Sequence, residues 1–143
     1  MKLTTKCRYG VRAVLEIAKN YDNRPTTRKE IAENQNIPES FLENILLELK
    51  RAGLVLSVRG AKGGFLLNRT PNSISMLDIV LILQTSIVPV ECVLNPMKCA
   101  KVAKCKTRPI WKKMHEAQEN VLQSYSVKSL LENKEIDQDC LLI

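Results

Sequence analysis

The segment 27–67 constrains the fold most, because two short amphipathic helices, a tight turn and a glycine-rich hairpin follow one another there. Thr27, with Glu30 three residues later, is the pattern of a capping box and predicts a helix start. The stretch 34–36 is typical of a turn, and a second helix opens with Ile37-Pro38 and ends before Gly53. Two short helices joined by a tight turn predict a helix-turn-helix.

The hairpin expected over residues 54–67 has a basic, glycine-rich tip. Apolar residues on both sides flank the run Arg59-Gly60-Ala61-Lys62-Gly63-Gly64, which predicts two short strands and a turn. A helix-turn-helix followed by a basic hairpin is a winged helix. We therefore predict a mainly α fold, a winged helix-turn-helix with a small β-hairpin wing.

Helical spacing of apolar residues predicts the remaining elements. A first helix is expected over 4–21, and a capping box at Ser75 and Asp78 opens a helix over 75–85. Residues 86–106, which hold three cysteines, indicate a loop. A long helix over 107–123 and a short one over 126–131 follow. One stripe of the long helix is apolar: Ile110, Trp111, Met114, Ala117 and Val121.

The positive charge of the chain is concentrated in its first half. The net charge is +7, and residues 1–70 hold thirteen Lys and Arg against seven Asp and Glu, whereas residues 71–143 hold nine against eight. This asymmetry favours contact of the first half with a polyanion such as nucleic acid. The alternative is a solvated basic surface without a partner.

The second helix of the helix-turn-helix is the expected recognition element. Its apolar face (Phe41, Leu42, Ile45, Leu46 and Leu49) should point inward, leaving polar residues to meet base edges. Asparagine can pair with adenine, and glutamate can accept from the cytosine amino group. The alternative is that these residues are merely solvated and that the wing is an ordinary turn. The candidate DNA-binding residues are Arg28, Glu39, Ser40, Glu43, Asn44, Lys50, Arg59, Gly60, Lys62 and Gly63.

The sequence favours a cytoplasmic protein without a membrane segment. The first residues lack an apolar leader, and the most apolar stretch, 74–94, contains Asp78 and Pro89. In a reducing compartment, five cysteines point to metal binding or redox chemistry rather than to disulfides.

Three of these cysteines, Cys92, Cys99 and Cys105, have the spacing C-x6-C-x5-C. Thiolates are soft ligands, which suit zinc, Cu(I) or an iron–sulfur cluster. The spacing lacks the C-x2-C pairs of many structural zinc sites. Three unmetallated thiols are the alternative that the spacing leaves open.

Several motifs resemble the IscR-like (Rrf-type) bacterial regulators. They are the opening residues 1–13, Ser-Phe-Leu-Glu at 40–43, Ser-Val-Arg-Gly-x-x-Gly-Gly at 57–64, and Cys-x-Thr-Arg-x-x-Trp at 105–111. The resemblance covers nearly all of residues 1–131. It implies a DNA-binding domain over 1–73, followed over 74–143 by a cluster-binding loop and dimerisation helices, the long helix 107–123 joining two copies.

The resemblance also implies an iron–sulfur cluster on Cys92, Cys99 and Cys105, with [2Fe–2S] as the first expectation and [4Fe–4S] as the alternative. It implies that Ser40, Glu43 and Arg59 touch DNA or tune its contact.

Two departures leave the fourth cluster ligand open. Arg108 stands where one type of relative has a histidine. Another type uses an aspartate near the N-terminus, where this chain has Arg8, preceded by Cys7 in place of the usual glycine. The candidates are Cys7, whose alternative is a buried thiol, and His115, whose alternative is a solvated or interface histidine.

The function that follows is a dimeric repressor that binds a palindromic operator on double-stranded DNA and senses cluster status or redox state. A cluster-assembly or metabolic enzyme is a further expected partner. The alternatives are a cluster-free regulator controlled by thiol oxidation or a partner protein, and a zinc-stabilised interaction module. An enzyme with a catalytic cysteine is disfavoured, since the single histidine has no evident partner arrangement.

Overall fold

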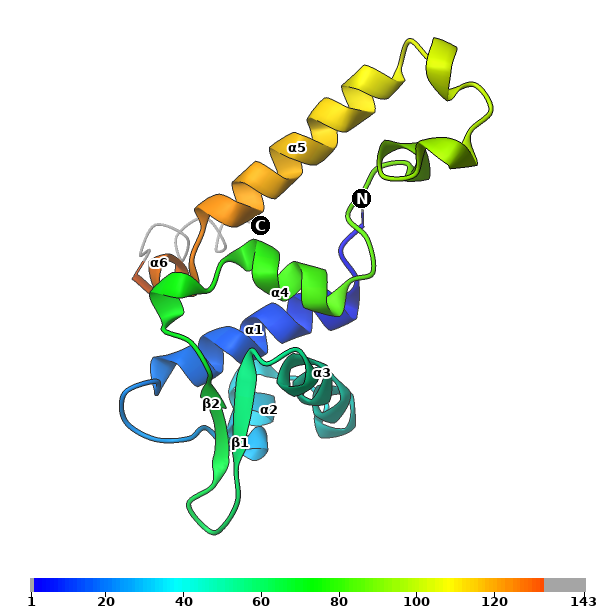
Figure 1. The fold of residues 1–143 in the computed structure, drawn as a ribbon. Helices are drawn as coiled ribbons and strands as arrows, with labels where there is room; N and C mark the ends of the chain where they lie inside the picture. The colour runs from blue at the N-terminus through cyan, green and yellow to red at the C-terminus, as the bar shows by residue number, and fades with distance from the viewer. Residues whose placement is uncertain (1, 133–143) are drawn as a thin grey trace.

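A computed structural model of the chain describes residues 2–132 (Figure 1). Most of it is helical, with one two-stranded hairpin, as predicted. The helices are α1 (Thr5–Lys19), α2 (Arg28–Gln35), α3 (Glu39–Arg51), α4 (Met76–Leu83), α5 (Arg108–Ser124) and α6 (Val127–Glu132). The strands are β1 (Val55–Val58) and β2 (Gly64–Leu67). Short 3-10 turns are η1 (Pro71–Ser73), η2 (Glu91–Val93), η3 (Pro96–Lys98) and η4 (Val102–Lys104).

The helix-turn-helix forms where its capping signals place it. The Glu30 backbone N–H donates to the Thr27 hydroxyl at 3.2 Å, and the Thr27 N–H donates to the Glu30 carboxylate at 3.1 Å. Asn36 ends α2 in the left-handed conformation, with φ of 51°. The Ile37 N–H then donates to the Ala32 carbonyl at 3.0 Å, which closes the turn before α3.

The core lies where α1 packs against α3 and α4. Gly10 allows this close approach, because a Cβ there would collide with Leu83 and press on Ile45. Leu42, Ile45, Leu46 and Leu49 of α3 are fully buried, as predicted. The prediction for Phe41 is wrong: its side chain is 40% exposed and meets the Tyr9 ring edge-on.

The wing is an antiparallel pair that runs from Val55↔Leu67 to Val58↔Gly64. It is tied to the segment before α2, since the Phe65 N–H donates to the Thr26 carbonyl at 2.8 Å. Gly64 has φ of +149°, and a Cβ there would collide with the Thr26 backbone. This close approach fixes the wing beside α2 and α3.

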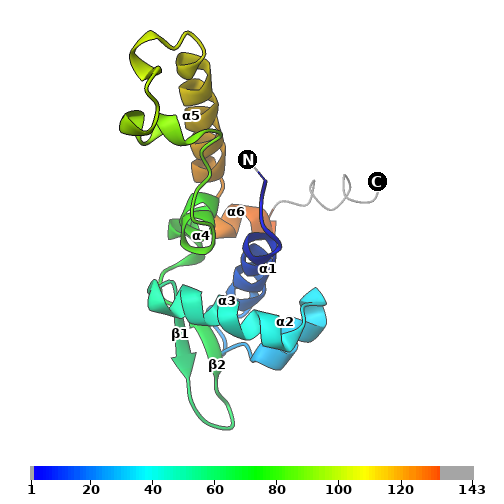
Figure 2. The same cartoon turned by 90° about the vertical axis from the view of Figure 1, so that its right-hand side faces the viewer.

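Helix α5 and the cysteine-bearing turns project away from the winged helix, as Figures 1 and 2 show. Helix α4 links the two parts, and α6 returns the chain to α1. The Val127 N–H donates to the Ile74 carbonyl at 2.8 Å, and the Val127 side chain is fully buried. The division of the chain at residue 73 stays a prediction, and residues 133–143 of the second part lie outside the described residues.

Across residues 2–132, the helices are all too short or too polar to cross a membrane.

Candidate nucleic-acid interface and cysteine loop

The exposed face of α3 carries the residues expected to meet DNA. Glu39, Ser40, Glu43, Asn44 and Lys50 are all exposed, opposite the buried stripe that fixes the helix on α1. Apart from Phe41, periodicity alone therefore oriented this helix correctly.

The wing tip is also exposed and basic. Arg59, Gly60 and Lys62 are exposed, and Gly63 is half-buried in the turn, where its N–H donates to the Gly60 carbonyl at 3.0 Å. Gly60 has φ of +108°, a conformation that favours glycine. The glycines have no side chains that would keep the backbone away from DNA, and Arg59 and Lys62 supply positive charge. Such a tip is suited to close approach to a narrow minor groove.

The recognition helix and the wing border one hollow of about 220 Å³. Its lining combines three elements: α2 contributes Arg28, α3 contributes Glu43, Leu46, Leu47 and Lys50, and the hairpin contributes Ser57 and Phe65. The polar face of α3 and the wing therefore lie side by side.

The carboxylates of α3 have cationic partners on other helices. Arg28 Nε lies 3.4 Å from Glu39 Oε2, and Arg28 Nη1 lies 3.4 Å from Glu43 Oε1. Lys6 Nζ lies 3.0 Å from Glu48 Oε2. The sequence did not reveal these pairs, because they join residues of different helices.

Glu30 fixes the start of α2 and carries a strongly shifted pKa. Its carboxylate accepts from Arg24 Nη2 at 2.6 Å and from the Thr27 backbone. Chiefly the Arg24 hydrogen bond lowers the pKa of Glu30 from 4.5 to about 2.

The folded state should therefore lose stability as the pH falls from about 4.5 toward 2. A depressed carboxyl pKa stabilises the fold above the unfolded-state pKa, and protonation removes that contribution. Urea unfolding at a series of pH values should show a shallower decline for Glu30→Gln than for the wild type. The exposed Glu33→Gln is the matched control, and an equal slope for Glu30→Gln and the wild type would contradict the assignment.

The three loop cysteines lie on or directly after successive 3-10 turns, which precede the N-terminal end of α5. Cys92 lies within η2, Cys99 follows η3 and Cys105 follows η4. All three are half-buried free thiols. Within residues 2–132, no three His, Cys, Asp or Glu side chains are close enough to hold a metal ion. This arrangement therefore does not bring the three thiols together.

Arg108, the residue that departs from the histidine pattern, holds the loop to α5. Its Nε donates to the Cys92 carbonyl at 3.1 Å, and its Nη2 donates to the Val93 carbonyl at 3.5 Å. Arg108 therefore ties η2 to the first turn of α5.

Cys105 lies just before α5 and has a lowered pKa. The Thr107 hydroxyl, 3.3 Å from the Cys105 sulfur, is the main cause, helped by the backbone N–H groups of Thr107 and Arg108. A lowered pKa enriches the thiolate, which is the metal-binding and nucleophilic form.

Neither candidate for a fourth ligand lies free beside the loop. Cys7 is 1% exposed in the core of α1, where burial raises the pKa of its thiol. His115 is 8% exposed rather than solvated, and its Nε2 lies 3.5 Å from Glu119. Its Nδ1 has no hydrogen-bond partner among residues 2–132. A buried neutral thiol is a poor ligand, so Cys7 would have to leave the core to bind metal.

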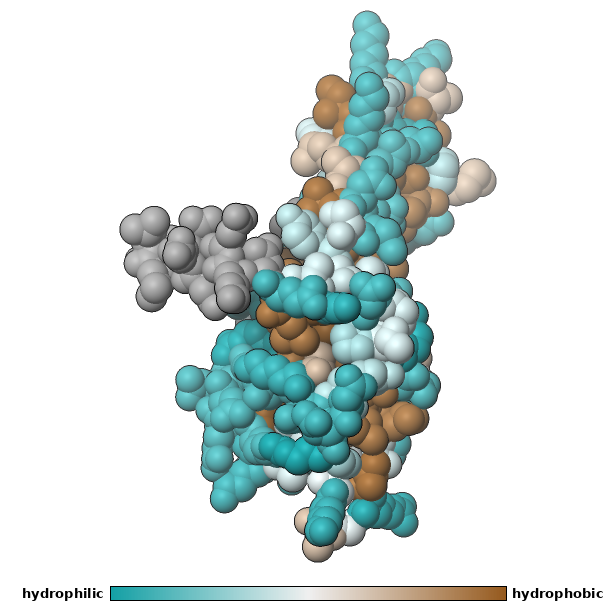
Figure 3. Space-filling model, turned by 90° about the vertical axis from the view of Figure 1, so that its left-hand side faces the viewer, coloured by the Kyte–Doolittle hydropathy of each residue, from teal (hydrophilic) through white to brown (hydrophobic). Residues whose placement is uncertain are grey.

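Helix α5 exposes an apolar stripe. Ile110, Met114 and Val121 are 55%, 43% and 59% exposed, and Trp111 is half-buried. Figure 3 shows hydrophobic side chains among polar ones over the projecting part of the molecule.

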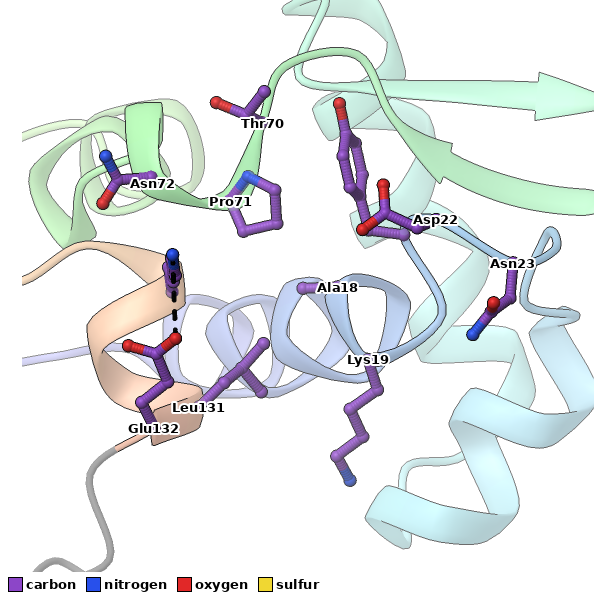
Figure 4. A pocket seen from close by; sticks show the side chains of 11 residues that line it. Ala18, Lys19, Asp22, Asn23, Thr70, Pro71, Asn72, Leu131 and Glu132 are labelled. Atoms are coloured by element: carbon purple, nitrogen blue, oxygen red, sulfur yellow. Dashed lines mark ion pairs between the residues drawn. The ribbon is translucent and has the colours of Figure 1, made fainter.

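A separate hollow of about 470 Å³ lies at the C-terminal end of α1 (Figure 4). Lys19, Asp22 and Thr70 are on its rim, and Lys128 pairs with Glu132 at 3.8 Å. Its charged groups are exposed, and it lies outside the α3–wing face.

Comparisons with known proteins agree with this geometry. The sequence profile of the Rrf2 family, described as "Iron-dependent Transcriptional regulator", matches residues 3–133. The HTH-type transcriptional regulator CymR of Bacillus subtilis (strain 168) is 37% identical over 99% of this chain and 98% of its own. The regulator IscR of Klebsiella pneumoniae (strain 342) is 34% identical over 95% of this chain and 83% of its own.

The fold is shared as well. A solved structure of CymR, described as the global cysteine regulator of B. subtilis, superposes with a TM-score of 0.77, covering 92% of this chain and 97% of that one at 36% identity. A mainly helical chain with a hairpin wing, matched along nearly its whole length by transcriptional regulators, is a DNA-binding protein and not an enzyme. The chain therefore belongs to the Rrf2 family of transcriptional regulators.

Proposed function

We propose that the chain represses transcription by binding a palindromic operator as a homodimer. One observation carries the proposal: the polar face of α3 borders the same hollow as the strands of the hairpin whose exposed tip is basic. In this geometry α3 enters the major groove with Ser40, Glu43 and Asn44 toward base edges, and Arg59 reaches the minor groove. Lys50 and Lys62 are placed for phosphate contacts, which position the protein without reading sequence.

The exposed apolar stripe of α5 supports the dimer. An isologous interface places the same stripe on both subunits, and the resulting two-fold axis matches a palindromic site. A pair of α5 helices would cover Ile110, Met114 and Val121, which a lone chain leaves in water.

The signal, on this proposal, acts at Cys92, Cys99 and Cys105. Their thiolates suit an iron–sulfur cluster, [2Fe–2S] or [4Fe–4S], in donor type, and the family description refers to iron. The thiols do not converge in the present arrangement, so a cluster requires the η2–η4 turns to move and a fourth ligand to come from elsewhere. A bacterial cytoplasm, where thiols stay reduced, is the compartment that suits this site.

A second candidate is a cluster-free regulator controlled by thiol oxidation or by a partner protein. The lowered pKa of Cys105 favours it, because a thiolate reacts with oxidants and disulfides. The similarity to CymR points the same way, because a solved structure of Staphylococcus aureus CymR is described as an oxidized form.

The test begins with protein purified without oxygen, measured for visible absorption, iron and acid-labile sulfide. Matched iron and sulfide that disappear in the Cys92→Ser, Cys99→Ser, Cys105→Ser variant would support the cluster. Protein that stays colourless after anaerobic reconstitution, yet changes DNA affinity on thiol oxidation, would support the second candidate. If neither anaerobic reconstitution nor thiol oxidation changes the protein's DNA affinity, the loop has no sensing role.

DNA binding is tested separately by selecting sequences from a random double-stranded pool. We expect a palindrome, and Arg59→Ala should weaken binding to it by roughly 5- to 100-fold, the range for one good base contact. Failure to enrich any sequence would overturn the repressor proposal itself.

A further inference from the structure

Two carboxylates lie one helical turn apart on the face of α3 that is proposed to enter DNA. The side chains of Glu39 and Glu43 are 52% and 67% exposed. Like charges four residues apart repel each other, and both oppose the approach of a polyanion. A recognition helix with this pattern requires something that neutralises and orients these groups.

Arg28, the first residue of α2, reaches both carboxylates at once. Its Nε and Nη1 each lie 3.4 Å from a carboxylate oxygen, one on Glu39 and one on Glu43. A guanidinium is planar and permanently charged, so it can pair with two carboxylates at once through different nitrogens, whereas an ammonium offers a single charged nitrogen. Thr27 and Glu30 form the capping box of α2, the helix that presents Arg28. The cap fixes the backbone position from which the Arg28 side chain extends.

This bridge contributes little to stability. The Arg28 side chain is 43% exposed, and ion pairs exposed to water in this way add little to the stability of a fold. Arg28 also lines the hollow between α3 and the wing, together with Glu43 and Lys50. Its position therefore matters most when DNA closes over this surface and excludes water.

We infer that Arg28 is a specificity-determining residue, which positions the Glu43 carboxylate and cancels the charge of Glu39. This inference rests on the proposed DNA binding. A carboxylate held in one orientation can accept from a single cytosine amino group, whereas a free one samples several orientations. Base discrimination at this position is then a property of the Arg28–Glu43 pair rather than of Glu43 alone.

The alternative role for Arg28 is a phosphate contact, and the two roles leave different signatures. Loss of a phosphate contact weakens binding uniformly across sequences and reduces the salt slope by about 1. Loss of a positioning residue changes the ranking of base pairs at one position per half-site. The effect should vanish once Glu43 is removed, because the two residues then have no interaction left to break.

The experiment measures dissociation constants of the full chain for its selected operator and for every single base-pair change. Wild type, Arg28→Ala, Glu43→Ala and the double variant are compared. We expect Arg28→Ala to reduce discrimination at one symmetric position by roughly 5- to 100-fold, and to have no such effect in the Glu43→Ala background. Arg28→Lys, which keeps the charge without the planar guanidinium, should retain affinity and lose part of the discrimination. This variant replaces Arg28→Ala in the test if the alanine variant folds poorly.

Lys29→Ala is the matched control, because the neighbouring Lys29 pairs with Glu33 of its own helix at 3.8 Å. It should leave discrimination unchanged. A uniform loss of affinity for Arg28→Ala with base discrimination unchanged, or a change in discrimination that persists without Glu43, would overturn the inference while the proposed function stands. Failure of the wild type to select any sequence would instead remove the proposed function.

Discussion

Glutamate at both Met114 and Val121 is expected to yield a monomer that binds the operator about a thousandfold more weakly, or worse. These side chains are 43% and 59% exposed on one stripe of α5. Two glutamates in each subunit would place four carboxylates without partners in an interface between paired α5 helices. The free energy needed to bury these charges would exceed the free energy gained from the apolar contact. A monomer holds one half-site, and the specific affinity then approaches non-specific binding, which is typically 10³-fold or more weaker.

Sedimentation or light scattering gives the oligomeric state, and fluorescence anisotropy on labelled operator gives the affinity. Asn120→Glu is the matched control, since it adds a charge at an exposed position of α5 next to Val121. The control should remain dimeric and bind normally. A double variant that stays dimeric would show that the subunits meet on another surface.

The expected bounds of the α-helices followed from local signals in the sequence to within about two residues, whereas the 3-10 turns within the loop expected over 86–106 did not. Both capping boxes, at Thr27 and Ser75, are formed by hydrogen bonds between residues three apart, so the sequence holds all the information they need. Phe41 was misplaced because it stands at the edge of the apolar stripe. Its ring packs against Tyr9 with a centroid distance of 5.7 Å instead of entering the core.

The candidate site was predicted in its residue types but not in its connections. Helical periodicity shows which side of α3 faces out, and so it identified Glu43. It could not show that Arg28 reaches Glu43 or that Arg108 binds the Cys92 carbonyl, because both contacts depend on how separate elements pack. Cysteine spacing likewise names donor types, whereas the path of the η2–η4 turns decides whether the thiols meet.

The core of the winged helix should be sensitive at Ile45, where alanine is expected to lower the free energy of unfolding by about 2–5 kcal/mol. The Ile45 side chain is 0% exposed and lies against Gly10, where α1 passes close to α3. Glycine offers no side chain that could move into the space left by the lost methyl groups. The cavity should therefore stay open, which places the cost in the upper part of the range.

Urea unfolding followed by circular dichroism measures this loss, and Leu47→Ala is the matched control. Leu47 is on the same helix but 42% exposed, so its replacement should cost about 1 kcal/mol or less. Since a domain of this kind is stable by only about 5–15 kcal/mol, Ile45→Ala should also shift the thermal midpoint by many degrees. Equal losses for Ile45→Ala and Leu47→Ala would mean that α3 is not anchored on α1 through Ile45, and that the recognition face is held by other contacts.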